Sequence, residues 1–213
     1  MRHARLAAII LLLSLCSVGN AQNLKVGIGG GVAFIQSPEG FTRDIPQAGL
    51  GFGVPSAIGI KAELSFPGSP FMVNGEITYL FMSGSGHFES SVYVPAIQGD
   101  VETKNHLFSL ALGGEWQVFQ GPVRPYLGAD FLINSFGDLI RRSANSAGTY
   151  EYRSGGGMRY GFGVGVGTQF SITPTIEIDV SGKYNVYNVF GQERFESTLG
   201  AINTKVSVLF SVF

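Results

Sequence analysis

Ionisable side chains recur at alternate positions in several short segments of the sequence, and alternate positions lie on one face of a β-strand. They comprise the following lysines and carboxylates: Lys61, Glu63, Glu76, Glu115, Asp130, Glu177, Asp179 and Lys183. Opposite charges gathered on one face can do two kinds of chemistry. They can neutralise one another as buried ion pairs that fill the protein, or they can line a polar passage for small solutes.

One ion pair can be predicted from the turn between two segments. The four residues Pro67–Pro70 form a tight turn that aligns Phe66 with Phe71, and this register sets Lys61 opposite Glu76. We therefore predict that the ammonium group of Lys61 pairs with the carboxylate of Glu76. The interior of a barrel of about eight strands is just wide enough for side chains, which favours a charge-compensated plug over a selectivity lining.

Four further carboxylates have no assured partner in the sequence. They are Glu115, Asp130, Glu177 and Asp179. These groups could bind a cation, but a hydrated network with lysines is the simpler expectation. The lysines available for such a network are Lys25, Lys183 and Lys205.

The sequence shows no convincing catalytic, cofactor or metal site. Glycines at 161, 163, 165 and 167 have a period of two, whereas a dinucleotide-binding loop needs G-x-G-x-x-G between a strand and a helix. Beyond the leader, the histidines are His87 and His106, and neither has a serine or acid at suitable spacing on the same face. We therefore predict a non-enzymatic protein without a cofactor.

Residues 1–21 are predicted to be a signal peptide. Basic residues at positions 2, 3 and 5 precede the apolar stretch 6–15, which is shorter than the ~20 residues that cross a bilayer as a helix. The small residues Gly19 and Ala21 indicate cleavage after Ala21, so the domain comprises residues 22–213. A lipoprotein signal acylated at Cys16 is the alternative, disfavoured because a bulky residue precedes this cysteine. Cleavage would remove Cys16, the one cysteine, so the mature chain could form no disulfide.

Composition narrows the class of protein further. Only 14% of the residues are charged, against about 25% in an ordinary soluble domain, while 31 residues are glycine and 12% are aromatic. The formal net charge of -1 provides no basic field for nucleic acid. We therefore expect little water-exposed surface and no nucleic-acid partner.

Eight segments show period-two alternation, and each is near the ~9 to 11 residues that a tilted membrane strand needs. Their approximate ranges are 24–35, 57–66, 71–82, 106–118, 125–135, 159–172, 176–189 and 201–213. Three connectors, at 67–70, 120–122 and 173–175, are tight turns. The other four connectors are long and polar, at 36–56, 83–105, 136–158 and 190–200. Residues 47–54 could extend the second segment. This pattern predicts an all-β, eight-stranded antiparallel up-and-down transmembrane β-barrel with short periplasmic turns and long extracellular loops.

The apolar face of these segments is predicted to contact lipid. It carries bulky residues such as Ile58, Ile60, Phe162 and Val164, whereas the charged face is rich in glycine. A soluble lipocalin-like barrel would carry Lys and Glu along its whole outer face, and glycines would gain nothing there; a crowded lumen needs small residues. Aromatic residues form a girdle near the short turns, at Phe66, Phe71, Trp116 and Phe170, and a second girdle near the long loops, at Phe34, Tyr79, Phe81, Phe108, Tyr160 and Tyr184.

The third long connector carries basic and aromatic residues suited to contact with sugars, phosphates or proteins. This set comprises Arg141, Arg142, Tyr150, Tyr152 and Arg153. A polar loop with ordinary charges accounts for the same composition, so the set is a candidate interaction site only.

Four features together carry a resemblance to a known family. They are the leader, the segment 121–130, the glycine-alternating segment 160–170 and the terminal aromatic residue Phe213. With these features the chain resembles the outer-membrane protein β-barrel domain family, the small barrels that include OmpA-type and opacity-type proteins. The apolar face of the last segment carries Val206, Val208, Phe210 and Val212. Phe213 directly follows Val212, so the alternation puts it on the opposite face of the segment.

The resemblance implies an integral protein of the bacterial outer membrane with a structural or surface-interaction role. A narrow passive porin-like channel for small solutes is the alternative. Outer-membrane lipid, lipopolysaccharide and the outer-membrane insertion machinery would be partners, with Phe213 as the insertion signal. A monomer is expected.

Overall fold

The computed structural model describes residues 23–47, 49–88, 99–145, 148–193 and 196–212. The predicted signal peptide, residues 1–21, and the terminal residue Phe213 lie outside this part of the chain. Within it, no helix is long and apolar enough to cross a membrane.

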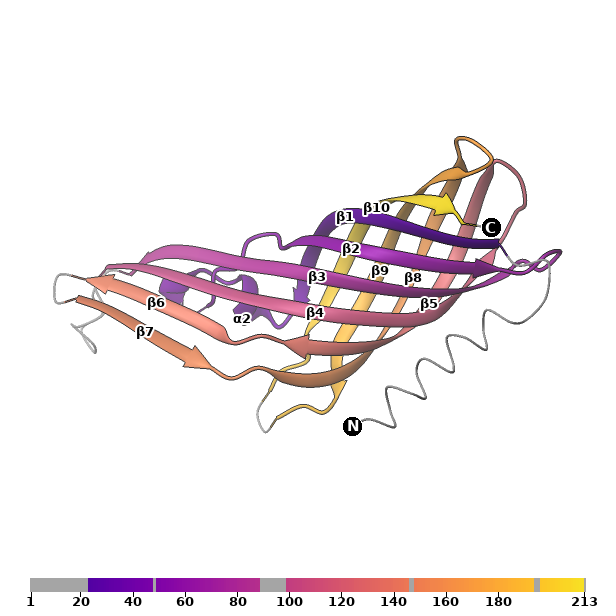
Figure 1. Ribbon diagram of the computed structural model, residues 1–213. Helices are drawn as coiled ribbons and strands as arrows, with labels where there is room; N and C mark the ends of the chain where they lie inside the picture. The colour runs from indigo at the N-terminus through magenta and orange to yellow at the C-terminus, as the bar shows by residue number, and fades with distance from the viewer. Residues whose placement is uncertain (1–22, 48, 89–98, 146–147, 194–195, 213) are drawn as a thin grey trace, which may run out of the picture.

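Ten strands of the described chain form one continuous antiparallel sheet (Figure 1). They are β1 (Asn23–Ser37), β2 (Ser56–Ser65), β3 (Phe71–Phe88), β4 (Gly99–Gln117), β5 (Val123–Phe136), β6 (Leu139–Asn145), β7 (Gly148–Ser154), β8 (Gly157–Ser171), β9 (Ile176–Phe190) and β10 (Gly200–Ser211). Two short helical segments, α2 (Glu39–Thr42) and η1 (Ile45–Gln47), lie in the first connector.

Eight of the strands close a barrel. Strands β1, β2, β3, β4, β5, β8, β9 and β10 each pair antiparallel with the next, and β10 pairs back onto β1. Closure leaves the eight barrel strands without a free edge, so their backbone groups find partners without water. The predicted fold class, an eight-stranded up-and-down transmembrane β-barrel, is confirmed.

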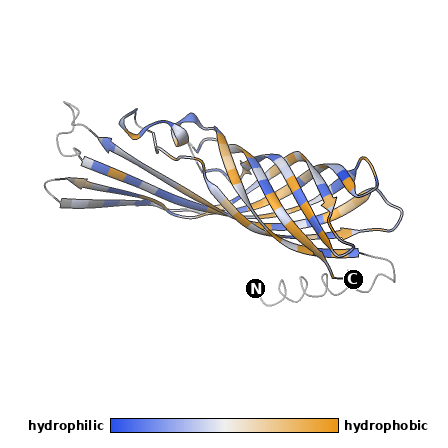
Figure 2. Cartoon of the chain, turned by 90° about the horizontal axis from the view of Figure 1, so that it is seen from above, coloured by the Kyte–Doolittle hydropathy of each residue, from blue (hydrophilic) through white to orange (hydrophobic). Residues whose placement is uncertain are grey.

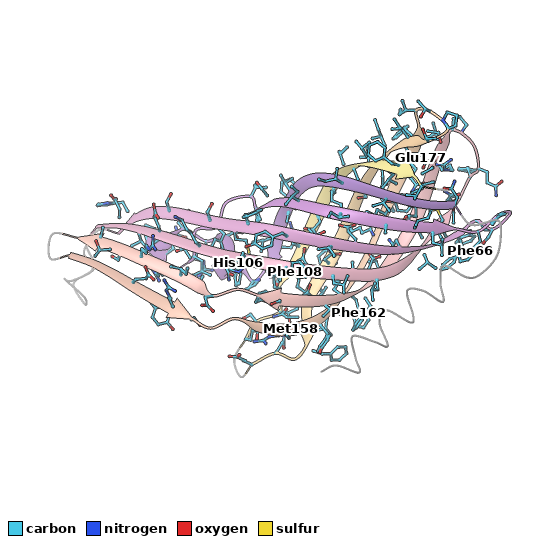
Figure 3. The ribbon with its side chains drawn as sticks, viewed as in Figure 1. Phe66, His106, Phe108, Met158, Phe162 and Glu177 are labelled. Atoms are coloured by element: carbon cyan, nitrogen blue, oxygen red, sulfur yellow. The ribbon has the colours of Figure 1, made fainter. Side chains whose placement is uncertain are left out.

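The period-two alternation sorts side chains between the outer wall and the lumen. Adjacent residues of β2 illustrate the difference, since Ile60 is 54% exposed on the outer wall and Lys61 is 2% exposed inside. Hydrophobic residues are prominent on the barrel, whereas the strand ends that extend beyond it are largely hydrophilic (Figure 2). Phe66 lies at the short-turn end, and Phe108 lies near the level where the longer strands leave the barrel (Figure 3).

The short connectors form at one end of the barrel, where local hydrogen bonds close them. In the first, the amide of Ser69 donates to the carbonyl of Phe66 at 3.1 Å, and Gly68 has a φ of 71°, a left-handed conformation that favours glycine. In the last, the hydroxyl oxygen of Thr173 accepts a hydrogen bond from the amide of Ile176 at 3.0 Å. These turns set the register of the hairpins that they join.

At the opposite end, two connectors differ from the prediction. Strands β3 and β4 stay paired as far as Phe88 and Gly99. Strands β6 and β7 pair with each other as a hairpin, and β6 pairs with β4 over Asp100–Lys104. The expectation of loops over 83–105 and 136–158 was therefore wrong for much of their length. Apolar alternation marks only the strand portions that contact lipid or a core. Polar strands beyond the membrane use the same backbone pairing without that signal.

The first connector also differs from the extension considered for it. Strand β2 begins at Ser56, and residues 47–54 do not continue it. This connector folds back instead, through a single bridge between Phe52 and Gly84 of β3 and a hydrogen bond from Gly53 N to the carbonyl of Ser83 at 3.2 Å. It therefore packs against the extended part of β3.

Glycines inside the lumen make room for the larger side chains. A Cβ added at Gly113 would overlap the carboxylate of Asp130, and a Cβ added at Gly167 would overlap the ring of Tyr126. Both contacts are with side chains that are almost fully buried. The glycine-rich charged face is thus a consequence of close packing in a narrow lumen.

Candidate functional site

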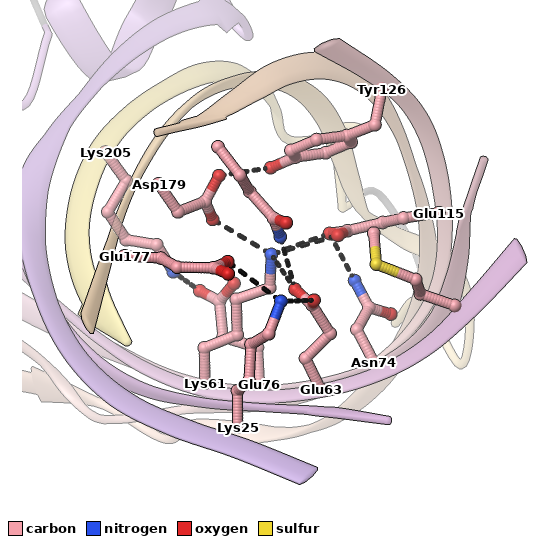
Figure 4. A network of polar contacts seen from close by, with 12 residues as sticks. Lys25, Lys61, Glu63, Asn74, Glu76, Glu115, Tyr126, Glu177, Asp179 and Lys205 are labelled. Carbon is pink, nitrogen blue, oxygen red and sulfur yellow. Dashed lines mark hydrogen bonds and ion pairs between the residues drawn. The ribbon is translucent and has the colours of Figure 1, made fainter. Parts of the chain in front are cut away.

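Lys61 lies in the lumen within a cage of carboxylates (Figure 4). Its Nζ atom is 2.9 Å from Glu115 Oε1, 2.9 Å from Asp179 Oδ2 and 3.5 Å from Glu63 Oε2. The ammonium group also lies 5.1 Å from the ring centroid of Tyr126, whose hydroxyl donates to Asp179 Oδ1 at 2.9 Å. Coulomb attraction to three carboxylates offsets the cost of taking this cation out of water.

The predicted pair between Lys61 and Glu76 does not form. The register is as expected, with Lys61 opposite Glu76, but Glu76 contacts Lys205 and accepts a hydrogen bond from Thr78 Oγ1 at 2.6 Å. The prediction was wrong because it considered only neighbouring strands. The flexible side chain of lysine reaches across the lumen instead, to carboxylates on β4 and β9.

Two other lysines connect the remaining carboxylates. Lys25 Nζ lies 2.8 Å from Glu177 Oε2 and 3.5 Å from Glu63 Oε1, and Arg124 Nη2 lies 2.5 Å from Glu177 Oε2. Lys183 Nζ is 2.7 Å from Asp130 Oδ2 and 3.6 Å from Glu115. Among the eight predicted lumen residues, seven are joined in one chain of contacts.

That connected network comprises Lys61, Glu63, Glu115, Asp130, Glu177, Asp179 and Lys183, joined with the help of Lys25. Glu76 stands apart with Lys205.

Side-chain amides donate hydrogen bonds to further carboxylate oxygen atoms of the network. Asn74 Nδ2 donates to Glu115 Oε1 at 2.7 Å, and Gln169 Nε2 donates to Glu63 Oε2 at 2.5 Å. Such contacts matter because a buried charge is stable only when its remaining hydrogen-bonding capacity is also met. Both amides lie at positions that share the charged face of their strands.

The side chains of the charged layer pack closely against one another. The side chains that meet there come from six different strands, and their exposed fractions are 0–2%: Lys61, Glu63, Met72, Glu115, Tyr126, Gln169 and Asp179. Inward-facing side chains of an open channel would be exposed to its water. This layer therefore fills the barrel as a packed core does.

A second layer, which is apolar, fills the lumen on the side of the long connectors. Its buried members are Ala33, Phe52, Leu80, Met82, Leu107, Leu132, Tyr187, Leu199 and Ala201. Asn134 links the layer to the wall, since its Nδ2 donates to the carbonyl of Tyr187 at 2.5 Å. Sequence analysis did not foresee this layer, because inward-facing apolar residues interrupt the alternation near the strand ends.

The first connector seals this apolar layer from outside. Ile45 of η1 is 1% exposed and Phe52 is 3% exposed. Gly84 and Gly86 of β3 permit the approach, because a Cβ on Gly84 would overlap the backbone of Gly51 and a Cβ on Gly86 would press against Ile45. The barrel thus holds a charged layer and an apolar layer of side chains, and the first connector packs on the apolar layer.

The extended parts of β3 and β4 together with the β6–β7 hairpin form a sheet that projects beyond the barrel (Figure 1). On the hairpin, Arg142 Nε lies 2.8 Å from Glu151 and Arg153 Nε lies 2.5 Å from it. Hydrogen bonds from Arg153 and Arg142 lower the pKa of Glu151, so this carboxylate is ionised at neutral pH. The ion triplet joins the two strands of the hairpin.

The predicted basic and aromatic set does not gather on a single face. Arg142 pairs across the hairpin with Glu151, whereas Arg141 pairs with Tyr152 and therefore lies on the other face. Tyr152 is 63% exposed. Arg153 shares a face with Arg142. The side chain of Tyr150 lies outside the part of the chain that the structure describes.

One edge of the projecting sheet is unpaired among the described residues. Strand β7 is hydrogen-bonded to β6 and to no further strand, and it ends the strand order. The opposite edge, formed by β3 beyond the end of β2, is covered by the first connector through Phe52 and Gly53. Among the described residues, the β7 edge therefore offers a row of free backbone donors and acceptors.

His87 and His106 lie outside the lumen, and His87 has an acidic partner that the sequence did not indicate. His87 Nδ1 is 2.9 Å from Asp100 Oδ1, a contact set by the β3–β4 register that pairs these two residues. His106 stacks on Tyr79, with ring centroids 5.6 Å apart. Within the described residues, the side-chain hydrogen bond of His87 is the one to Asp100.

A further polar cluster that sequence analysis missed orders the last connector. Arg159 Nε lies 2.8 Å from Glu196, and Asn188 Nδ2 donates to the same carboxylate at 2.7 Å. Burial alone would raise the pKa of Glu196, but these contacts and a hydrogen bond from the amide of Glu193 lower it. Arg159 and Glu196 are 37 positions apart and follow no pattern, so the sequence carried no signal for the contact.

A closed barrel with an apolar outer wall and a charged, filled lumen defines a transmembrane β-barrel protein. The chain belongs to the outer membrane protein beta-barrel domain family, whose sequence model matches residues 8–210. Membership places the protein in the bacterial outer membrane. The predicted family resemblance is confirmed.

Solved structures similar to this chain include small barrels from three bacterial groups. Neisserial surface protein A is 15% identical, with a TM-score of 0.49, and the match covers 90% of this chain and 97% of that one. Ail of Yersinia pestis is 13% identical, with a TM-score of 0.43 and coverage of 91% and 100%. The N-terminal β-barrel domain of Pseudomonas aeruginosa OprF is 12% identical, with a TM-score of 0.37 and coverage of 90% and 100%. No curated protein sequence matches the chain.

Proposed function

We propose that this protein is a non-enzymatic outer-membrane barrel whose lumen is a structural core and whose projecting sheet contacts other proteins outside the cell. The observation that carries the proposal is the projecting four-stranded sheet with its free edge at β7. Unpaired edges of this length are usually covered, and an extended segment of a partner can add to such an edge as a further strand.

The surroundings of the edge suit a protein partner. Strand β7 contains threonine and tyrosine, residue types that favour strand pairing, and Tyr152 is 63% exposed beside Arg141. Tyrosine and arginine are enriched where proteins bind one another. The hairpin itself is held by the ion triplet of Arg142, Glu151 and Arg153, so its edge is preorganised.

The packing of the lumen supports a structural core over the alternative of a narrow passive pore. When one partner of a buried ion pair is removed, the other partner keeps an uncompensated charge. Loss of a single residue of the network is therefore expected to destabilise the folded barrel. The partners expected in the membrane are outer-membrane lipid and lipopolysaccharide, with the insertion machinery acting on a monomer after signal-peptide removal. Phe213 remains the proposed insertion signal.

The proposal can be tested by removing the hairpin. Replacing residues 139–154 by a short glycine-serine turn should leave a barrel that still folds, because no barrel strand lies in this range. Heat-dependent gel mobility verifies folding, and adherence of cells bearing either form to immobilised extracellular proteins measures the function. A matched control replaces Arg43 and Asp44 of the first connector by serine. Unchanged adherence after removal of the hairpin would contradict the proposal.

A further inference from the structure

The free edge of β7 presents a defined set of backbone groups. In an antiparallel sheet, the N–H and C=O of one residue point to one neighbouring strand, and those of the next residue point to the other. The carbonyl of Ser83 in β3 accepts a hydrogen bond from the amide of Gly53, so the backbone groups of Ser83 point away from β4. Alternation through the β3–β4, β4–β6 and β6–β7 registers then directs the backbone groups of Thr149, Glu151 and Arg153 to the free edge.

The side chains of these edge residues lie on a face of the projecting sheet whose charges balance. Residues opposite one another in the register, and residues two apart along a strand, share a face. Apart from His87, the charged members of this face in the described chain are three carboxylates and three cations: Asp100, Glu102, Glu151, Lys104, Arg142 and Arg153. Two copies of this face therefore carry no excess of one charge that would drive them apart.

Strand β7 is complementary to a second copy of itself in one antiparallel register. Two copies that meet through the same edge are related by a two-fold axis perpendicular to the sheet, so their strands run antiparallel. Hydrogen bonds between them must join the edge residues, and one such register sets Glu151 opposite Arg153 of the second copy, twice by symmetry. A shift of two residues would instead set Glu151 opposite Glu151, which is unfavourable.

In the complementary register, both faces of the joined sheet are well matched. The charged row reads Glu102, Arg142, Glu151 and then Arg153 of the second copy, so the sign of the charge alternates across the junction. On the other face Tyr152, which is 63% exposed, faces its own copy in a non-hydrogen-bonded pair, where side chains approach most closely.

We propose that the partner of the β7 edge is a second copy of this protein in a facing membrane, so that the projecting sheets join two cells. The inference rests on the proposed function and names its partner. The two-fold axis reverses the direction in which the sheet projects from its barrel (Figure 1), which sets the two barrels in opposed membranes. One contact is short, but many copies on each surface act together and raise the strength of the junction.

The proposal is tested by mixing two populations of bacteria that produce the full chain and carry different fluorescent labels. Truncated lipopolysaccharide lets the two surfaces approach, and flow cytometry counts clusters that contain both labels. Glu151→Lys sets two cations opposite each other and Arg153→Glu sets two carboxylates opposite each other, so each variant alone should lose clustering. A mixture of the two variants restores opposite charges at both positions and should cluster again. Glu39→Lys, a charge reversal in the first connector at a side chain that is 79% exposed, should cluster as the unchanged protein does.

Clustering that survives either reversal, or a mixture that clusters no better than its components, would overturn the proposal. Heat-dependent gel mobility verifies that each variant folds. If a reversal does not fold, a disulfide test decides. Tyr152→Cys, in a chain whose Cys16 is serine, should link two chains, because Cα atoms in a non-hydrogen-bonded pair are about 4.5 Å apart. Thr149→Cys should not, because its own copy lies roughly 20 Å away along the strand.

The outcome for this partner can be told apart from the outcome for the proposed function. Absence of clustering and of the disulfide at position 152, together with adherence to extracellular proteins that is lost when residues 139–154 are removed, would overturn the second copy as partner and leave the proposed function standing. If adherence is also unchanged by that removal, both are overturned.

Discussion

Replacement of Lys61 by methionine is the perturbation that best reveals what the charged layer does. Methionine has a similar length but no charge, so Lys61→Met leaves Glu63, Glu115 and Asp179 facing one another in a layer where all are at most 1% exposed. Removing one partner of a buried ion pair typically costs about 3–5 kcal/mol, since the remaining charge keeps its desolvation penalty. We expect a loss of this size in the free energy of unfolding.

The barrel provides its own spectroscopic reporter for this measurement. Trp116 is the single tryptophan, and it lies on the outer wall with 58% of its surface exposed to the surroundings of the barrel. Its fluorescence therefore changes when the refolded barrel leaves lipid vesicles during urea unfolding. The free energy of unfolding follows from the midpoint and slope of that transition.

A matched variant separates the buried charge from a general effect of losing a lysine. Lys104→Met removes a lysine whose side chain is 58% exposed and whose ion pair with Glu102 is in water, so it should cost at most about 1 kcal/mol. Adding Glu115→Gln to Lys61→Met should restore part of the loss by removing one of the stranded carboxylates. Equal stabilities of Lys61→Met and Lys104→Met would refute the reasoning.

Three further predictions concern the lumen, the first connector and the hairpin. Gly167→Leu inserts a side chain where Tyr126 packs, and such overpacking should cost about 1–3 kcal/mol in the same urea assay. Phe52→Ala removes a side chain that is 3% exposed, so limited proteolysis should cleave the first connector faster while the barrel stays heat-modifiable; an unchanged cleavage rate would contradict this packing. The lowered pKa of Glu151 in the folded hairpin means that its stabilisation is present above the unfolded pKa of about 4.3 and is lost as pH falls through the lower folded value. Amide protection of β6 and β7 should therefore decrease below about pH 4, and Glu151→Gln should remove that pH dependence.

The barrel itself could be predicted from the sequence because its determinants are local. Alternation at period two assigns each side chain to a face, and turns such as Pro67–Pro70 set which strands pair and in what register. The pairing of Lys61 with Glu76 as opposite residues was correct as a register. These features depend on residues close in sequence or joined by a short turn.

The contacts across the lumen could not be predicted in the same way. Which carboxylate Lys61 reaches depends on the diameter and shear of the closed barrel, and its partners Glu115 and Asp179 lie 54 and 118 positions away. The β6–β7 hairpin escaped notice for another reason. Strands surrounded by water need no apolar face, so their sequence resembles that of a polar loop.

Single-channel recording most directly tests the central claim that the lumen is closed. A chain of residues 22–213 is refolded into planar bilayers in concentrated KCl, and its folding is verified by the heat-dependent gel shift. The packing of the charged and apolar layers predicts a folded barrel that produces no conductance steps. Reproducible steps from the folded barrel, altered in size by Lys61→Met, would contradict the closed lumen and establish a pore.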